Sequence, residues 1–152
     1  MTPARLILLV EDNPADARLT VEALHRADPD LAVEIYEDGE SALVRLHDTA
    51  APLPHLVLLD LNLPGIDGRE VLETIKADPR LCKIAVCVLT TSRAQADVDR
   101  AYGQHTNCYV VKPIDLHAFR AAIQQIQQFW FTTAQLPAGS GSTPGQGTPT
   151  TP

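Results

Sequence analysis

The sequence predicts an α/β domain in which helices cover both faces of a five-stranded parallel sheet, on two observations. Short apolar runs alternate with longer segments whose apolar residues recur at helical spacing. The chain has 152 residues, of which 45% are hydrophobic and 20% charged, enough for one domain with a buried core. Strands that alternate with helices in this way are typical of parallel sheets in three-layer sandwiches.

The expected strands are the five short apolar runs, namely Leu6–Val10, Ala32–Tyr36, Leu56–Leu59, 84–89 and Cys108–Val111. Each is four to six residues long, and the amphipathic segments between them are longer. An order of 2-1-3-4-5, as in flavodoxin-like (βα)5 folds, would place the first and third strands side by side.

The expected helices follow the strands one by one. Their apolar residues are Leu19, Ala23 and Leu24 in the first; Ala42, Leu43 and Leu46 in the second; Val71, Leu72 and Ile75 in the third; Ala94, Val98 and Ala101 in the fourth; and Leu116, Phe119, Ile123, Ile126 and Trp130 in the fifth. Three start signals agree with these positions: Asn13 before Pro14, Asp67 with Glu70, and Ser92 with Gln95.

Composition excludes several classes of protein. The formal net charge of -7 argues against nucleic acid or an anionic membrane as a direct partner. No apolar run is long enough to span a membrane, and the N-terminal segment lacks the cleavage site of a signal peptide. The three cysteines, Cys82, Cys87 and Cys108, lack CxxC spacing. We therefore expect reduced thiols in a cytoplasmic protein.

The composition changes abruptly near the C-terminus. Residues 137–152 read "PAGSGSTPGQGTPTTP", with no charged and no large apolar side chain. Such a segment cannot bury enough apolar surface to offset the entropy of ordering. We expect a folded domain over 1–136 followed by a disordered tail or linker.

Polar side chains stand where four of the expected strands end. Glu11 and Asp12 follow the first strand, Asp60 the third, Thr90 the fourth and Lys112 the fifth. In open α/β sheets, ligands bind outside the carboxyl ends of the strands, where the strand order reverses. Each feature alone is typical of a solvated loop or a helix start, but all four occur at the same end of the sheet. We therefore expect one shared pocket.

The chemistry of this pocket points to phosphate and magnesium. Three carboxylates, from Glu11, Asp12 and Asp60, would repel one another unless a cation lay between them. Oxygen ligands without histidine or cysteine favour Mg²⁺. A carboxylate beside Mg²⁺, the ammonium of Lys112 and the hydroxyl of Thr90 is equipped to attack phosphorus and carry an acyl phosphate.

Four segments resemble a known family in order and spacing. They are "LLVEDNPAD", "LVLLDLNLPGIDG", "VCVLTTS" and "CYVVKP". Over residues 5–131 the chain resembles the CheY-like receiver domain of bacterial two-component response regulators. The resemblance implies that Asp60 accepts a phosphoryl group from a histidine kinase. It also implies that Glu11 and Asp12 hold Mg²⁺, together with Asp60 and the backbone carbonyl of Asn62.

The resemblance assigns the remaining site residues as well. Lys112 would contact the phosphoryl group. The peptide bond between Lys112 and Pro113 is expected to be cis. Thr90 and Tyr109 would form a coupled switch, in which Thr90 bonds a phosphoryl oxygen and Tyr109 rotates inward. Without the motif, Tyr109 would be taken for an edge-strand aromatic that packs locally.

Two positions depart from the family pattern. His105 stands where a glycine is usual, and a glycine there permits a left-handed turn. Histidine can enter that conformation at some energetic cost, so we expect the loop before the fifth strand to be either strained or differently shaped. Thr91, after the switch threonine, replaces the usual Ala or Gly. Its larger side chain is expected to shield the phosphoryl group and slow its hydrolysis.

The last expected helix carries Phe129, Trp130 and Phe131 in a row, so its aromatics point to all sides. One interpretation is a frayed helix end with one or two rings tucked back. The other is a contact surface for a homodimer through the face made by the fourth helix, fifth strand and fifth helix. This ending resembles that of the small receivers paired with phytochrome histidine kinases.

Three other functions would place different demands on the sequence. A phosphate shuttle or sink would use the same Asp60 to pass phosphate to a histidine phosphotransfer protein. A pseudo-receiver would lack site residues, and all of them are present. A flavodoxin-type electron carrier needs a phosphate-binding loop where "EDNPAD" offers acids. We expect a regulator that is not an enzyme.

Overall fold

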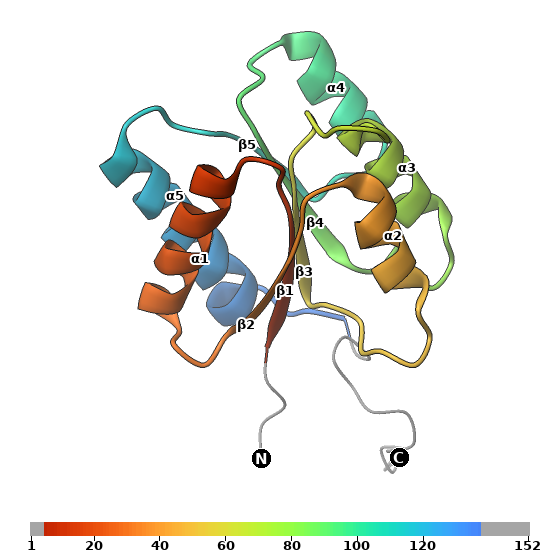
Figure 1. Ribbon diagram of the computed structural model, residues 1–152, viewed down its shortest axis with the longest axis horizontal. Helices are drawn as coiled ribbons and strands as arrows, with labels where there is room; N and C mark the ends of the chain where they lie inside the picture. The colour runs from red at the N-terminus through yellow and green to blue at the C-terminus, as the bar shows by residue number, and fades with distance from the viewer. Residues whose placement is uncertain (1–4, 138–152) are drawn as a thin grey trace.

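The computed structural model describes residues 5–137, and within them five strands alternate with five helices (Figure 1). The predicted tail lies outside the described residues except for Pro137. The elements are β1 (Leu6–Val10), α1 (Pro14–Ala27), β2 (Ala32–Tyr36), α2 (Gly39–His47), β3 (Leu56–Leu59), α3 (Gly68–Ala77), β4 (Ala85–Thr90), α4 (Gln95–Gly103), β5 (Cys108–Val111), α5 (Leu116–Gln128) and a single π-helical turn (Phe129–Thr133).

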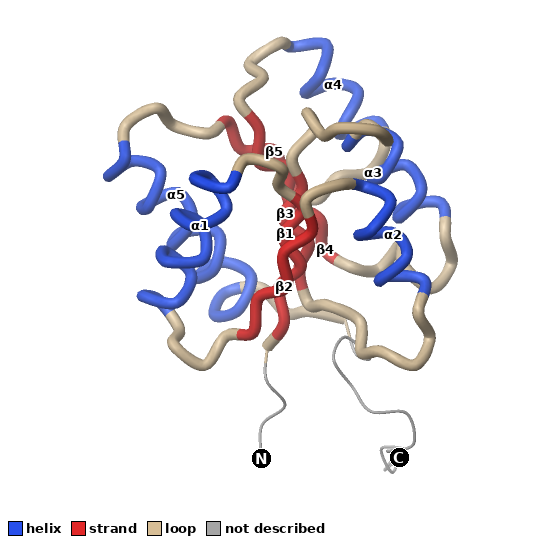
Figure 2. The backbone as a smooth tube through the Cα atoms, viewed as in Figure 1, coloured by secondary structure: helices blue, strands red, loops and turns tan. Residues whose placement is uncertain are grey.

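The strands form one parallel sheet in the order β2-β1-β3-β4-β5. Helices α1 and α5 cover one face, and α2, α3 and α4 cover the other (Figures 1 and 2). The predicted flavodoxin-like three-layer fold is confirmed. In this order β1 and β3 are neighbours, and the register pairs Val10 with Leu59 at their carboxyl ends.

The central strands are buried on both faces. Every residue of β1, β3 and β4 is buried, because the helical layers leave neither face to water. Two apolar clusters result. One contains Leu72 and Ile75 of α3, and the other contains Phe119 and Ile123 of α5. The edge strands β2 and β5 are only partly buried, so the site at the middle of the sheet rests on its most buried part.

Two predicted boundaries were wrong. Strand β4 spans Ala85–Thr90, one residue later at both ends than the expected 84–89, which places the Thr90 side chain on the sheet itself. Ser92 does not cap α4. The N-cap is Ala94, whose side chain has no capping oxygen, and the Ser92 hydroxyl instead donates to Asp97 Oδ2 at 2.5 Å. The predicted cap residue therefore contacts a side chain in the first turn of α4 and leaves the backbone amides of that turn without a side-chain cap. The other two caps, Asn13 and Asp67, are confirmed.

Of the two expectations for His105, the structure shows the strained one: its backbone is in the left-handed conformation, with φ of 70°. It terminates α4: the amide of His105 donates to the Tyr102 carbonyl at 3.0 Å, and that of Thr106 donates to the Ala101 carbonyl at 3.0 Å. This pair of bonds is the Schellman motif, in which glycine usually occupies the left-handed position. The histidine at position 105 therefore serves to end α4, and it lies away from the carboxyl ends of the strands.

The aromatic triplet does not continue α5. The helix ends at Gln128, and a π-helical turn carries Phe129 to Thr133. Phe131 turns back onto the domain, where its ring lies 6.1 Å from that of His55 and 5.4 Å from the Arg5 guanidinium. Phe129 remains half exposed and meets Trp130 edge to face at 5.1 Å. Phe131 is thus tucked back, as the first interpretation expected, whereas Phe129 is exposed, as a contact surface would require.

Among the described residues, no helix combines the length and the apolar character that crossing a bilayer requires.

Candidate functional site

The predicted site residues converge at the carboxyl end of the sheet. Backbone hydrogen bonds prolong the sheet by one residue past each strand: Asp60 N donates to the Val10 carbonyl at 3.0 Å, and Lys112 N donates to the Thr90 carbonyl at 2.7 Å. Asp60 and Lys112 follow their strands in sequence, but these hydrogen bonds attach their backbones to the sheet. Their side chains therefore extend from the hydrogen-bonded sheet.

The loop after Asp60 is held tightly against it. Asn62 N donates to Asp60 Oδ1 at 3.0 Å, and Gly68 N donates to the Leu61 carbonyl at 3.0 Å. A Cβ on Gly68 would lie 2.2 Å from the Asp60 carbonyl oxygen, so only glycine allows α3 to begin here. The pattern "DLNLPGIDG" thus closes a turn that fixes both the carboxylate and the Asn62 backbone.

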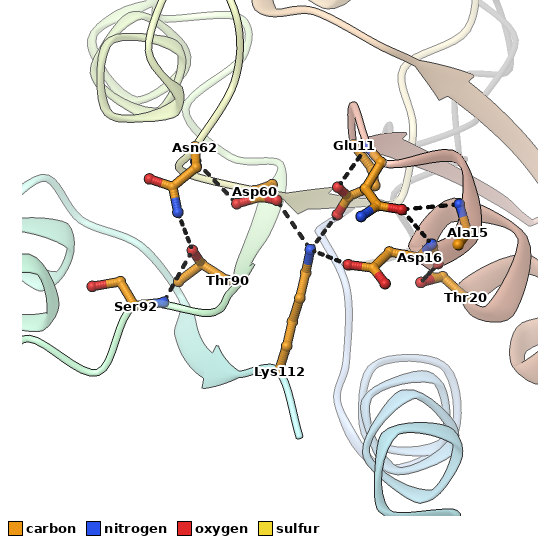
Figure 3. A network of polar contacts seen from close by, with 10 residues as sticks. Glu11, Ala15, Asp16, Thr20, Asp60, Asn62, Thr90, Ser92 and Lys112 are labelled. Atoms are coloured by element: carbon orange, nitrogen blue, oxygen red, sulfur yellow. Dashed lines mark hydrogen bonds and ion pairs between the residues drawn. The ribbon is translucent and has the colours of Figure 1, made fainter. Parts of the chain in front are cut away.

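Lys112 lies at the centre of the site (Figure 3). Its Nζ is 2.6 Å from Glu11 Oε2, 3.0 Å from Asp60 Oδ2 and 3.0 Å from Asp16 Oδ2. Lys112, Glu11 and Asp60 are each at most 6% exposed. A buried ammonium surrounded by three carboxylates has a partner for each of its three N–H groups.

Burial and the neighbouring charges both shift the pKa values of Glu11 and Lys112. Burial raises the pKa of Glu11 from 4.5 to about 7; the hydrogen bond from Lys112 lowers it and the charge of Asp60 adds to the rise. Burial alone would lower the pKa of Lys112, but the hydrogen bond to Glu11 and the charge of Asp60 raise it above its ordinary value. Lys112 is therefore a permanent cation at neutral pH, and Glu11 can exchange a proton there.

Three carboxylates form a group that can hold a metal ion. One oxygen from each of Glu11, Asp12 and Asp60 lies within 4.8 Å of the others. Asp12 is exposed, whereas the other two are buried, so the group opens to water on the Asp12 side. An all-oxygen donor set with one open side fits a hard divalent cation that retains water ligands.

Thr90 and Tyr109 are linked through Ser92. Thr90 is fully buried, and its Oγ1 is 3.5 Å from both Asn62 Nδ2 and Ser92 N. The Tyr109 hydroxyl donates to the Ser92 carbonyl at 2.9 Å. The two predicted switch residues therefore contact the same residue of the loop between β4 and α4, Thr90 at the Ser92 amide and Tyr109 at the Ser92 carbonyl.

Two features of the site differ from the sequence analysis. The Lys112–Pro113 peptide bond, expected to be cis, is trans, as are the other peptide bonds of the described residues. The trans form is the ordinary preference even before proline. No sequence motif marks Asp16 as a site residue, although it contacts Lys112. Its only sequence signal was an acid in the first turn of a helix that follows a site strand.

The site geometry and the sheet order together define a receiver domain, and comparison with known proteins agrees. The sequence profile of the response regulator receiver domain matches residues 7–124. The chain belongs to this family.

Particular relatives extend the match over most of the chain. Response regulator Rcp1 of Synechocystis sp. is 45% identical over 140 residues, which cover 90% of this chain and 95% of Rcp1. The probable methanogenesis regulatory protein FilR2 of Methanothrix harundinacea is 44% identical, over 82% of this chain and 83% of FilR2.

Solved structures show the same fold. The crystal structure of the Mn(2+)-bound form of Rcp1 superposes with a TM-score of 0.84 at 45% identity, over 88% of this chain and 99% of that one. The phosphorylated cyanobacterial phytochrome response regulator RcpA gives 0.84 at 44% identity, over 89% and 99%. The resemblance to phytochrome response regulators that the sequence predicted is therefore confirmed, in sequence and in fold.

Proposed function

We propose that this receiver accepts a phosphoryl group on Asp60 from the phosphohistidine of a sensor kinase and thereby regulates a partner. The observation that carries the proposal is the contact of Asp60 Oδ2 with the buried Lys112 ammonium, beside the Glu11–Asp12–Asp60 carboxylates. The function is regulatory, in the cytoplasm, and not that of an enzyme with a separate substrate.

In this reaction an Asp60 oxygen forms a bond to phosphorus while the bond from phosphorus to the histidine nitrogen breaks. The electron pair of that bond returns to the imidazole. Lys112, already hydrogen-bonded to Asp60, can donate to a phosphoryl oxygen, and Thr90 Oγ1 lies 3.5 Å from Asn62 Nδ2, two residues after Asp60. Catalysis of such a transfer consists mostly of positioning and charge stabilisation, which these residues provide.

We assign Mg²⁺ to the carboxylates of Glu11, Asp12 and Asp60, with the backbone carbonyl of Asn62 as a further ligand. When bound, the cation would neutralise charge on the phosphoryl oxygens. Support comes from the all-oxygen donor set and from Rcp1, a relative crystallised with Mn(2+). Glu11 must be ionised to serve as a ligand, and a pKa of about 7 makes this possible at neutral pH.

The conformational output would pass through Thr90 and Tyr109. A phosphoryl group adds about -1.5 to -2 charge and three acceptor oxygens, toward which Thr90 can turn. Thr90 and Tyr109 share the Ser92 segment, so a shift of one releases space for the other. Tyr109 lies on β5, which joins α4 and α5 in one face, and a partner bound there would sense the change.

That same face is our candidate homodimer interface. Beside β5 and α5 lies an open hollow of about 450 Å³, lined in part by Cys108, Val110, Phe129 and Trp130. Phe129 is 50% exposed at its rim. Phe131, also predicted for the interface, packs on His55 and is not among the residues that line this hollow. Replacing Trp130 with Glu should yield a monomer by light scattering.

The matched control for that substitution is Val44→Glu. Val44 is 73% exposed on α2, on the opposite layer, so an added charge there should leave the mass unchanged. An unchanged dimer in the Trp130 variant would contradict this interface.

The kinase is proposed to be of the phytochrome type, because RcpA is a phytochrome response regulator of similar sequence. Transfer from such a kinase, labelled on its histidine, should require Mg²⁺ and be abolished by Asp60→Asn. Asp30→Asn, which neutralises an exposed acid beyond the end of α1, is the control and should accept label normally. Labelling of the Asp60 variant at the wild-type rate would refute the assignment of the phosphoacceptor.

A shuttle remains the second candidate, since it needs the same Asp60. It predicts that the phosphorylated protein passes its label rapidly to a histidine phosphotransfer protein and that its mass in solution does not change. A phosphorylation-dependent change in mass, without onward transfer, favours the regulator.

A further inference from the structure

Asp16 contacts the buried lysine from a helix and not from a strand end. Its Oδ2 is 3.0 Å from Lys112 Nζ, the same separation as between Lys112 Nζ and Asp60 Oδ2. The backbone of Asp16 is held on both sides: its amide donates to Asn13 Oδ1 at 3.1 Å, and its carbonyl accepts from Thr20 Oγ1 at 2.7 Å. Figure 3 shows the carboxylate directed from α1 toward the lysine.

We propose that Asp16 is a positioning residue for phosphoryl transfer, acting through Lys112. Together with Glu11 it engages two of the three N–H groups of the ammonium, so that the third is directed at Asp60. When Asp60 becomes phosphorylated, only this third N–H has to pass from Asp60 Oδ2 to a phosphoryl oxygen. The inference rests on the proposed function and adds a residue to it.

The arrangement matters because electrostatic stabilisation works best when the donor is in place before the charge develops. A lysine side chain is long and flexible, with about 2 kcal/mol of rotamer entropy. Glu11 and Asp60 hold it from the sheet, and Asp16 holds it from α1. Anchors on two separate elements restrict both the position of the ammonium and its rotation.

Another explanation exists for an acid at this position. A carboxylate in the first turn of a helix interacts favourably with the helix dipole, whatever lies nearby. That role does not need Lys112. It also does not require the carboxylate to be partly buried, and the Asp16 side chain is only 29% exposed. The two explanations therefore differ in whether the effect of Asp16 depends on the lysine.

A double-mutant cycle separates them. The rate of Asp60 phosphorylation by acetyl phosphate, at saturating Mg²⁺, is measured for wild type, Asp16→Asn, Lys112→Met and the double variant. Asp16→Asn should slow phosphorylation about tenfold in the wild-type background, the typical effect of one charged hydrogen bond. In the Lys112→Met background it should change the rate less than about twofold. Glu22→Gln, at an exposed position of the same helix, should match wild type.

A second readout needs no phosphorylation. In metal-free protein the urea midpoints of the four variants should be non-additive, because Asp16 and Lys112 are in direct contact. Equal slowing in both backgrounds, or additive midpoints, would overturn the inference in favour of the helix role. Normal phosphorylation of Asp16→Asn would overturn it while leaving the proposed function intact. A wild-type protein that is not phosphorylated would overturn both.

Discussion

Glu11→Gln should remove a pH dependence of stability that the metal-free protein owes to this one buried carboxyl. Glu11 is 3% exposed, and burial raises its pKa from 4.5 to about 7. The unfolded chain then releases the proton of Glu11 at a lower pH than the folded protein does. As pH rises between the two values, the unfolded state gains stability relative to the folded state, so this group destabilises the fold at alkaline pH.

The size follows from the two pKa values. One pKa unit corresponds to about 1.36 kcal/mol, so the cost of Glu11 is about 1 kcal/mol at about pH 5.5 and about 3 kcal/mol at about pH 8.5. Gln keeps the shape and the acceptor of the protonated form and does not titrate. The advantage of Glu11→Gln over wild type should therefore grow by about 2 kcal/mol across this range.

The assay is urea denaturation in the presence of a chelator at several pH values, with wild type and Glu11→Gln in parallel. The difference between the two proteins is the quantity to follow, because titrating groups that do not interact with Glu11 cancel in it. His55 is one of these: burial lowers its pKa, so it destabilises the fold at acid pH in both proteins. A difference that stays constant from about pH 5.5 to about pH 8.5 would refute the reasoning.

Three further outcomes are expected. His105→Gly should stabilise the domain by about 1 kcal/mol in urea denaturation, because the left-handed turn after α4 costs a residue with a side chain about that amount; a loss of stability would contradict this. Asn107→Ala should destabilise it by about 1–3 kcal/mol, because Asn107 Oδ1 accepts from Val86 N at 2.8 Å and from Lys76 Nζ at 3.0 Å; thermal or urea unfolding would measure the loss. Thr91→Ala should shorten the lifetime of the phosphoryl group, followed as decay of label in a denaturing gel. Decay at the wild-type rate would show that Thr91 does not shield the site.

The local pattern of the sequence was enough to determine the layers of this protein. Buried strands such as Leu56–Leu59 are continuous apolar runs, and the helices between them repeat their apolar residues every three or four positions. Both signals depend on neighbours in sequence, so they can be interpreted without the fold. The sequence also predicted that Asp60, Thr90 and Lys112 lie together at the carboxyl end of the sheet, because all strands of a parallel sheet end on the same side.

Only the tertiary structure decided which side chains touch. Lys112 reaches Glu11 across 101 positions and Asp16 across 96, and the second of these contacts depends on how α1 is rotated about its axis on the sheet. That rotation is set by packing of the whole layer, which no local pattern encodes. The same reason explains why Phe131 turned inward while Phe129 stayed exposed, since each ring took the space that neighbouring elements left. The sequence by itself therefore determined at which end of the sheet the charged residues of the site lie, and packing decided which of them are in contact.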